Sequence, residues 1–139
     1  MTQPSILIRD ATRSSWNGSR HARIYFNNFF FNLVRDSKCD YPSACNAVET
    51  LLIHRDLVDH DDFFVRLCNS LKQESVKLYS GPRLHQLLTF GPPKAKNLTT
   101  EYGGLEMAIE IVDDYLQAID HINFHGSGHT ECIVTNDGK

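Results

Sequence analysis

Residues 105–122 read LEMAIEIVDDYLQAIDHI, and this stretch decides the expected fold. Its apolar residues recur at intervals of four and three, which places them on one face of a helix: Leu105, Ile109, Val112, Leu116 and Ile119. Glu106, Glu110 and Asp113 keep the same spacing on the opposite face. The pattern predicts a C-terminal helix over about 104–122 whose apolar face is buried and whose acidic face is exposed. Truncating Val112 or Leu116 to alanine is then expected to cost about 2–4 kcal/mol.

Shorter helices are expected around this central one. Capping and periodicity predict a helix from Ser19 to about Asp36, with a strand through residues 24–26 as the competing assignment. A second helix is expected to begin at Pro42, a third after Asp59 or His60, and a short one over 83–90.

Three segments, 5–9, 76–79 and 131–135, have the composition of strands and could form one small sheet. The predicted fold class is therefore mainly α: four to five helices packed around the helix at 104–122, with or without that sheet. A pure helical bundle stays open. The domain prediction is a single globular domain over 1–139, with short tails at 1–4 and 136–139.

Composition places the chain among globular proteins. It has 139 residues, 41% hydrophobic and 22% charged, with a formal net charge of −3. Basic residues prevail in 1–38 and 63–96, and acidic residues in 39–62 and 97–139. Folding could turn this alternation into basic and acidic faces or could mix the blocks again. No stretch has the length of a membrane span.

The four cysteines are Cys39, Cys45, Cys68 and Cys132, and no two form a C-x-x-C pair. The N-terminus lacks the apolar run of a signal peptide. We therefore expect reduced thiols in the cytoplasm or nucleus. Cys45 and Cys68 are expected to pack on the apolar sides of helices, and nothing local marks any of these cysteines as a nucleophile.

One candidate metal site lies near the C-terminus. It consists of four potential zinc ligands: His121, His125, His129 and Cys132. The first two are one helical turn apart, and Gly126 and Gly128 would let the chain fold back. The alternative is a histidine-bearing tail in which a histidine interacts with the negative end of the helix.

A second candidate set is His54 with Asp59, His60, Asp61 and Asp62. Together with His21 and Asp113 or Asp114, it is similar to the ligand set of HD-type phosphohydrolases. This resemblance implies bound metal ions that activate water against a phosphate. Helix capping by the same aspartates is the alternative, and it explains them through the helix dipole.

A basic segment interleaved with aromatic residues suggests nucleic-acid binding, because arginines contact phosphates and rings stack on bases. The candidate residues are Arg13, Trp16, Arg20, Arg23, Lys94 and Lys96. Alternatively, Trp16 covers an edge of the core while the arginines pair with the acidic blocks.

No Gly-rich phosphate loop and no G-x-S-x-G elbow is present, and no cofactor is predicted. The leading functional hypothesis is thus a non-enzymatic regulatory or adaptor-like domain that binds another protein. An RNA- or DNA-binding accessory protein and a metal-dependent phosphohydrolase are the alternatives.

Overall fold

The computed structural model describes residues 5–9, 20–59 and 62–135, with side chains from Asn28 onward. Strands and helices alternate along these residues as in α/β proteins. In chain order they are β1 Ser5–Arg9, α1 Arg20–Cys39, β2 Thr50–His54, the 3₁₀ turn η1 Arg55–Leu57, α2 Phe63–Gln73, β3 Lys77–Ser80, α3 Pro82–Leu87, β4 Glu106–Val112, α4 Tyr115–His125 and β5 Glu131–Thr135.

All described strand pairs are parallel and form one five-stranded sheet in the order β3-β4-β2-β1-β5. β4 pairs with β2 on one side, with Leu51 opposite Ile109, and with β3 on the other, with Leu78 opposite Met107. Parallel strands require crossover connections, and helices α1 to α4 provide them.

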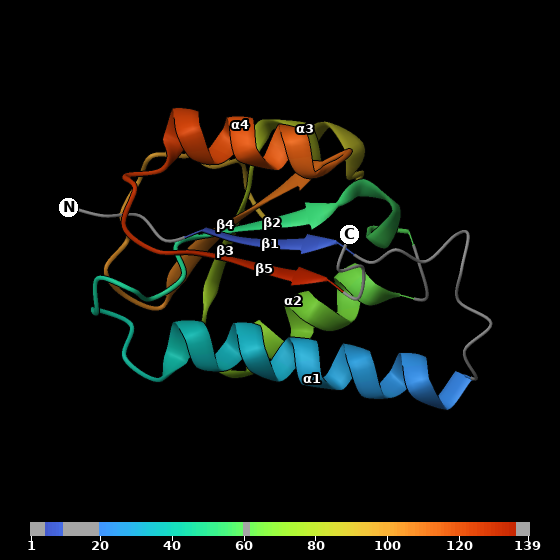
Figure 1. Ribbon diagram of the computed structural model, residues 1–139. Coiled ribbons are helices and arrows are strands. Elements are labelled where there is room, and N and C mark those ends of the chain that lie inside the picture. The colour runs from blue at the N-terminus through green and yellow to red at the C-terminus, as the bar shows by residue number, and fades with distance from the viewer. Residues whose placement is uncertain (1–4, 10–19, 60–61, 136–139) are drawn as a thin grey trace.

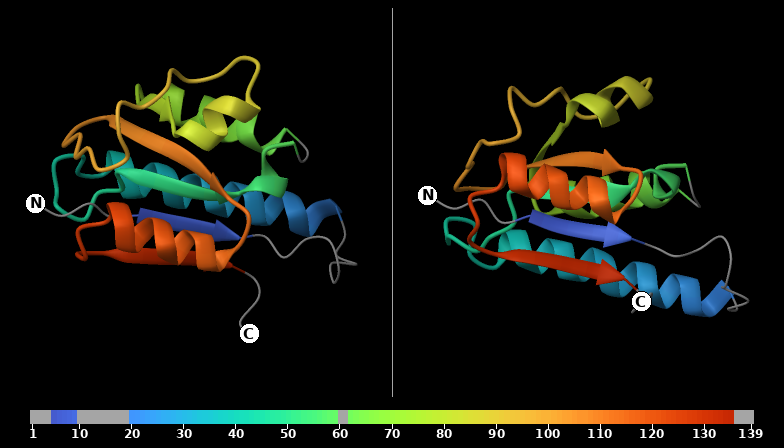
Figure 2. Two further views of the ribbon diagram at one scale, coloured as in Figure 1. Left: turned by 90° about the horizontal axis from the view of Figure 1, so that it is seen from above. Right: turned by 45° about the horizontal axis from the view of Figure 1, so that its top comes forward.

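The helices cover both faces of the sheet. Figure 1 shows α1 and α2 below the sheet and α3 and α4 above it. In both views of Figure 2 the loops that precede β2 and β4 lie at the amino-terminal edge of the strands. No helix in the described part of the chain is long and apolar enough to cross a membrane.

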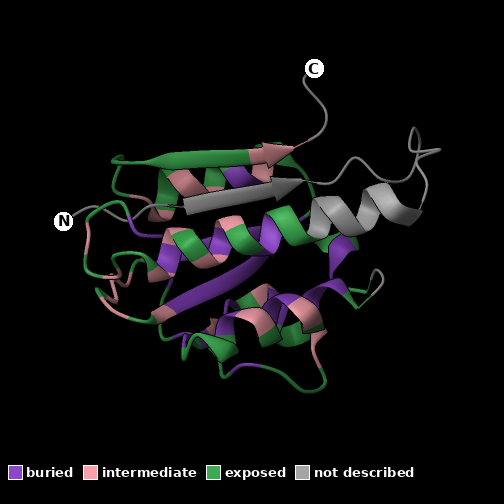
Figure 3. Cartoon of the chain, turned by 90° about the horizontal axis from the view of Figure 1, so that it is seen from below, coloured by how far each residue is buried: buried purple, intermediate pink, exposed green. Residues whose placement is uncertain are grey.

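The main core fills the space between the sheet and the α1–α2 layer. Phe30, Leu67 and Leu71 from the helices and Leu51 and Ile109 from the strands are fully buried in one cluster. β4 is buried along almost its whole length, whereas the edge strand β5 is largely exposed (Figure 3). The sheet therefore has a buried centre and one open edge.

The mainly α prediction is wrong, and the reason lies in residues 105–122. Glu106–Val112 form the strand β4, and a helix begins only at Tyr115. A parallel strand buried on both faces has a nearly continuous apolar run, and here that run ends where α4 begins. The side chain of Asp114 accepts a hydrogen bond from the Gln117 N–H and so caps α4. A strand followed directly by a helix thus reproduced the spacing of one long helix.

The predicted exposure of the acidic face also needs correction at Glu110. This side chain is only 3% exposed. Its carboxylate accepts hydrogen bonds from the backbone N–H groups of Arg83, Leu84 and Ile111. These bonds satisfy a charge that burial would otherwise make costly.

The helix expected from Pro42 is absent. Residues 41–47 form turns, and the apolar run that follows is the central strand β2. The expected strands at 5–9 and 131–135 are present with those bounds, and α1 and α2 lie close to two predicted helices. The error was therefore greatest for the two central strands, whose residues are buried on both faces.

Candidate functional site

The four cysteines differ sharply in their surroundings. Cys68 is buried, and desolvation raises the pKa of its thiol to about 11. Burial also raises the pKa of Cys39. A thiol reacts through its thiolate, so these two are poor nucleophiles near neutral pH. Cys45 and Cys132 are exposed and are the better candidates.

Cys45 lies at the tip of a turn that the backbone holds in place. The Ala47 N–H donates to the Ala44 carbonyl at 3.1 Å, which closes a turn around Cys45 and Asn46. The Val48 N–H donates to the Ser37 carbonyl at 3.0 Å and fixes this turn to the end of α1. An exposed thiol on an anchored turn is accessible and still has a defined position.

A buried ion pair lies directly after this turn. Lys38 Nζ is 3.4 Å from Glu49 Oε2, and the two side chains are 0% and 5% exposed. Lys38 Nζ makes no hydrogen bond, and desolvation lowers its pKa despite the nearby carboxylate. Removing either partner should destabilise the fold, because the other charge would remain buried without a counter-charge.

Glu49 also joins the Cys45 turn to the loop before β4. Its carboxylate accepts hydrogen bonds from the Tyr102 N–H at 3.0 Å and the Gly103 N–H at 3.3 Å. Gly103 has φ +62, a left-handed conformation that glycine adopts without strain. Two loops at the amino-terminal edge of the sheet are therefore held together by one buried carboxylate.

Two tyrosines extend this edge toward β3. The rings of Tyr79 and Tyr102 are stacked, with centroids 5.3 Å apart. The Tyr79 hydroxyl donates to Glu106 Oε2 at 2.6 Å, and Lys77 Nζ lies 3.9 Å from the same carboxylate oxygen. Burial raises the pKa of Tyr102 to about 12, so this phenol stays protonated.

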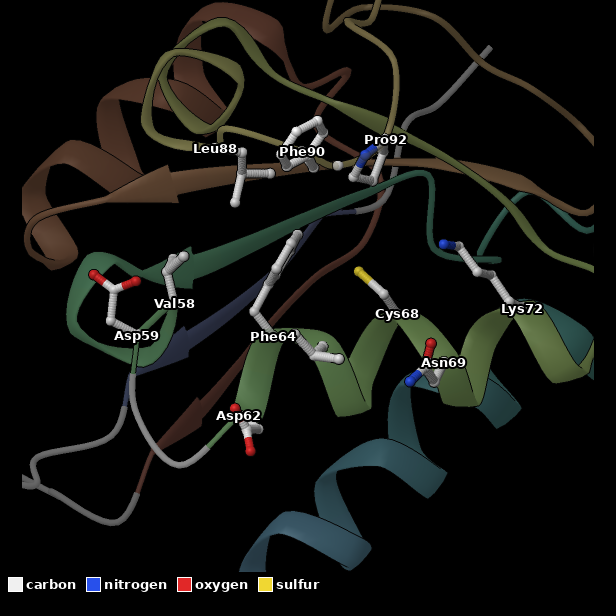
Figure 4. Close-up of a pocket in the computed structure, with 12 residues that line it drawn as sticks. Val58, Asp59, Asp62, Phe64, Cys68, Asn69, Lys72, Leu88, Phe90 and Pro92 are labelled. Carbon is white, nitrogen blue, oxygen red and sulfur yellow. The ribbon is translucent and has the colours of Figure 1, made fainter.

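A separate pocket of about 410 Å³ lies between α2 and the loop that follows α3. Figure 4 shows Phe64, Leu88 and Phe90 around it and the Cys68 sulfur directed toward it. Because this thiol is held protonated, the pocket offers apolar contacts but no activated sulfur.

Only two of the four predicted metal ligands come together. The rings of His121 and His125 on α4 have centroids 4.6 Å apart. Cys132 lies on β5 two residues before Val134, which packs against the core on the α1–α2 face. Alternate residues of a strand share a face, so Cys132 is on the opposite side of the sheet from α4. His129 lies in the loop between α4 and β5, where its ring contacts the Thr130 hydroxyl.

The environment of the histidine pair lowers both pKa values. Burial and the neighbouring His125 lower the pKa of His121 to about 4. Burial also lowers the pKa of His125, although Glu110 opposes the shift. Within residues 5–9, 20–59 and 62–135, no three His, Cys, Asp or Glu side chains gather into a metal-binding group.

The set that resembles HD-type phosphohydrolases is only partly described. His60 and Asp61 lie outside the described residues, and the side chain of His21 is not described. His54 Nδ1 accepts a hydrogen bond from the Asp56 N–H at 3.2 Å and so caps η1. Asp113 forms an ion pair with Arg83 at 2.8 Å. These contacts give His54 and Asp113 structural roles.

The predicted nucleic-acid residues lie in separate parts of the chain. Arg13 and Trp16 are outside the described residues, and Arg20 and Arg23 stand at the start of α1 with side chains not described. Lys94 and Lys96 are exposed on the loop beside β3, where Lys94 forms a bridge with Ser80.

Sequence reasoning missed Cys45, which it placed on the buried side of a helix. The signal for exposure was the run Tyr41-Pro42-Ser43 with Asn46, because proline, serine and asparagine are turn residues before a β-branched strand.

The chain is similar in sequence to enzymes. It is 49% identical over 111 residues to delta-1-pyrroline-5-carboxylate synthase 1 of Oryza sativa subsp. japonica, a match that covers 78% of this chain and 15% of that protein. It is 41% identical over 105 residues to a gamma-glutamyl phosphate reductase of Picosynechococcus. This match covers 76% of this chain and 24% of that protein. The chain thus spans less than a quarter of these relatives' lengths. No family model matches it.

The fold has a close counterpart. The crystal structure of gamma-glutamyl phosphate reductase from Thermotoga maritima superposes with a TM-score of 0.77, over 98% of this chain and 30% of that one. At 23% identity this likeness supports the parallel α/β fold alone.

The comparisons overturn the functional hypotheses made from the sequence. Relatives at 41–49% identity are named as enzymes, so the prediction of a non-enzymatic regulatory or adaptor-like domain is wrong. The prediction of a helical bundle is wrong because the described strands form a parallel sheet. The alternative prediction of an RNA-binding protein is wrong because the relatives are named as enzymes. The expected protein partner stays a prediction.

Proposed function

We propose that this chain is the thiol-bearing part of an enzyme that reduces an acyl phosphate, of which gamma-glutamyl phosphate is the example given by the relatives' names. The observation that carries the proposal is the exposed thiol of Cys45 on its anchored turn. An aligned stretch covering 76–78% of this chain must include Cys45 wherever the alignment begins. It need not include Cys132.

The chemistry that suits such a thiol is acyl transfer. The Cys45 thiolate attacks the acyl carbon, the carbon–oxygen bond to phosphate breaks, and a thioester and inorganic phosphate result. A thioester is a better hydride acceptor than a carboxylate, since its carbonyl is not stabilised by a full negative charge. The turn that holds Cys45 fixes the sulfur before the substrate arrives, which lowers the entropic cost of the reaction.

Reduction also requires a hydride donor, usually a nicotinamide cofactor. The described residues do not fit a dinucleotide. The turn after β3 offers only Gly81 before α3, whereas a dinucleotide loop has several glycines between strand and helix. The hydride step is therefore not assigned to this chain. The proposed compartment is the cytoplasm, where thiols stay reduced.

The test is acylation of the protein by acetyl phosphate, a simple acyl phosphate. We expect one acetyl group on wild type and on Cys132→Ser, and none on Cys45→Ser. Neutral hydroxylamine should remove it, because hydroxylamine cleaves thioesters but leaves acetylated lysines intact. Peptide mass spectrometry locates the group. Equal acylation of both exposed thiols, or no hydroxylamine-sensitive product, would refute the proposal.

A further inference from the structure

The histidine pair on α4 has an unexplained feature. His121 Nε2 and His125 Nδ1 are inaccessible to solvent and have no hydrogen-bond partner. The remainder of each side chain is partly exposed. Buried polar atoms in folded proteins are nearly always paired with protein groups, water or an ion. Two such atoms on neighbouring rings therefore point to a ligand that both nitrogens share.

The pair lines a pocket of about 300 Å³ between α4, the end of β4 and the start of α3. Glu110 and Asp120 also line it, and its one cation is Arg83. The Arg83 guanidinium is already bound to Asp113 at 2.8 Å and to the Gln117 side chain at 2.6 Å. The remaining carboxylates make the pocket favourable for a cation and unfavourable for an anion.

The spacing of the two histidines fits chelation. Residues four apart on a helix lie on the same face one turn apart, and paired histidines at this spacing bind zinc in H-E-x-x-H enzymes. The ring centroids are 4.6 Å apart and the ring planes are inclined at 44°, so one ion can lie between two ring nitrogens. The Glu110 oxygens are occupied by three backbone N–H groups, so this carboxylate supplies charge and not a ligand.

We propose that His121 and His125 chelate a late first-row divalent transition-metal ion, with water in the remaining coordination positions. Imidazole nitrogen is a preferred ligand of Zn²⁺, Cu²⁺ and Ni²⁺, whereas Mg²⁺ prefers oxygen. The proposed site has two protein ligands instead of the four predicted from the sequence. Cys132 is excluded because it lies on β5, on the other face of the sheet. It is independent of the thiol chemistry proposed for Cys45.

The experiment is titration of the full chain with Zn²⁺, Ni²⁺, Cu²⁺ and Mg²⁺ by calorimetry, in a Cys45→Ser background that removes one exposed thiol. We expect one ion per chain, tightest for Cu²⁺, and no heat with Mg²⁺. His121→Gln and His125→Gln should each weaken binding by about tenfold or more, the cost of disturbing even an outer-shell partner of a metal. His129→Ala and Cys132→Ser are the matched controls and should bind as the parent does.

Two results would overturn the proposal. One is the absence of stoichiometric binding, and the other is an equal loss of affinity in the His129 or Cys132 control. A second measurement does not depend on whether the histidine variants fold. In the Cys45→Ser protein with both histidines intact, paramagnetic Cu²⁺ should broaden the amide NMR signals of residues 117–125 before those of 129–132. Broadening centred on any other segment refutes the site.

Discussion

The two faces of the sheet differ in how many apolar side chains are buried against them. On the α1–α2 face, among the described residues, large side chains such as Phe30, Leu51 and Leu67 belong to one extensive buried cluster. On the other face, the buried cluster under α4 consists of Leu52, Val112 and Ala118, with Ile122 packed against it. α4 also leaves apolar side chains in solvent: Tyr115, Leu116, Ile119 and Phe124.

The difference in packing suggests that the α1–α2 face mainly stabilises the fold, whereas the candidate reactive groups lie elsewhere. The first face has the larger share of the apolar contacts that stabilise the sheet, since its strand residues pack closely against α1 and α2. The second face and the loops at the amino-terminal edge contain the features that packing does not explain. These are the unpaired histidine nitrogens and the exposed Cys45 thiol.

The largest expected difference concerns cysteine reactivity. Cys68, on the α1–α2 face, has a pKa raised to about 11 by burial. At pH 8 only about one such thiol in a thousand is ionised, so Cys68 should react with iodoacetamide at least about 100-fold more slowly than Cys45. Its rate should rise with pH up to about 11. Time-resolved peptide mapping measures both rates, and comparable labelling at pH 8 would contradict the burial.

The second prediction compares neighbouring residues of β2 that point to opposite faces. Leu51 and Leu52 are both fully buried. Leu51→Ala should lower the free energy of unfolding by about 4 kcal/mol, because rigid neighbours from two helices cannot fill the cavity. Leu52→Ala should cost about 2–3 kcal/mol, since α4 can move toward the sheet. Urea denaturation gives both values. Equal losses would mean that the two faces are equally well packed.

The third prediction tests the ion pair that joins the loops. Glu49→Gln should cost about 2–3 kcal/mol, because Lys38 then remains buried without a counter-charge. The double variant Lys38→Met with Glu49→Gln should regain much of that loss, since no charge is left in the interior. Thermal unfolding of both variants checks the pair. A single variant as stable as wild type would show that the pair contributes little.

The sequence predicted the strands nearest the two ends of the chain better than the two central strands β2 and β4. The edge strand β5 and the terminal strand β1 were found because turn residues bound short β-branched runs. β4 was missed because Met107 to Val112 are buried on both faces and apolar except at Glu110, and a run without regular alternation fits helix and strand equally well. Only the pairing of β4 between β2 and β3 distinguishes them, and pairing is a long-range property.

The candidate sites divide in the same way. His121 and His125 could be found from local spacing, because four residues on a helix determine a shared face. The exposure of Cys45 depended on Pro42 beginning a turn instead of a helix, and proline is compatible with both. Cys132 is separated from the histidines because its face of β5 is turned toward α1. Which face of a strand is turned toward a helix depends on strand pairing and register, which local sequence does not reveal.

The smallest expected effect is at Leu116, for which the sequence predicted a loss of about 2–4 kcal/mol. In the structure Leu116 is 56% exposed on the outer side of α4, whereas Val112 on β4 is 3% exposed. Leu116→Ala removes few contacts and replaces leucine with the best helix former, so unfolding should change by less than about 0.5 kcal/mol. Val112→Ala is the matched control and should cost about 2 kcal/mol, because it opens a cavity beneath α4.

Urea denaturation of both variants at several protein concentrations distinguishes the two sites. A loss above about 1 kcal/mol at Leu116 that grew with concentration would show that another surface covers this face of α4, and the contrast between the two faces would then hold only for the isolated chain.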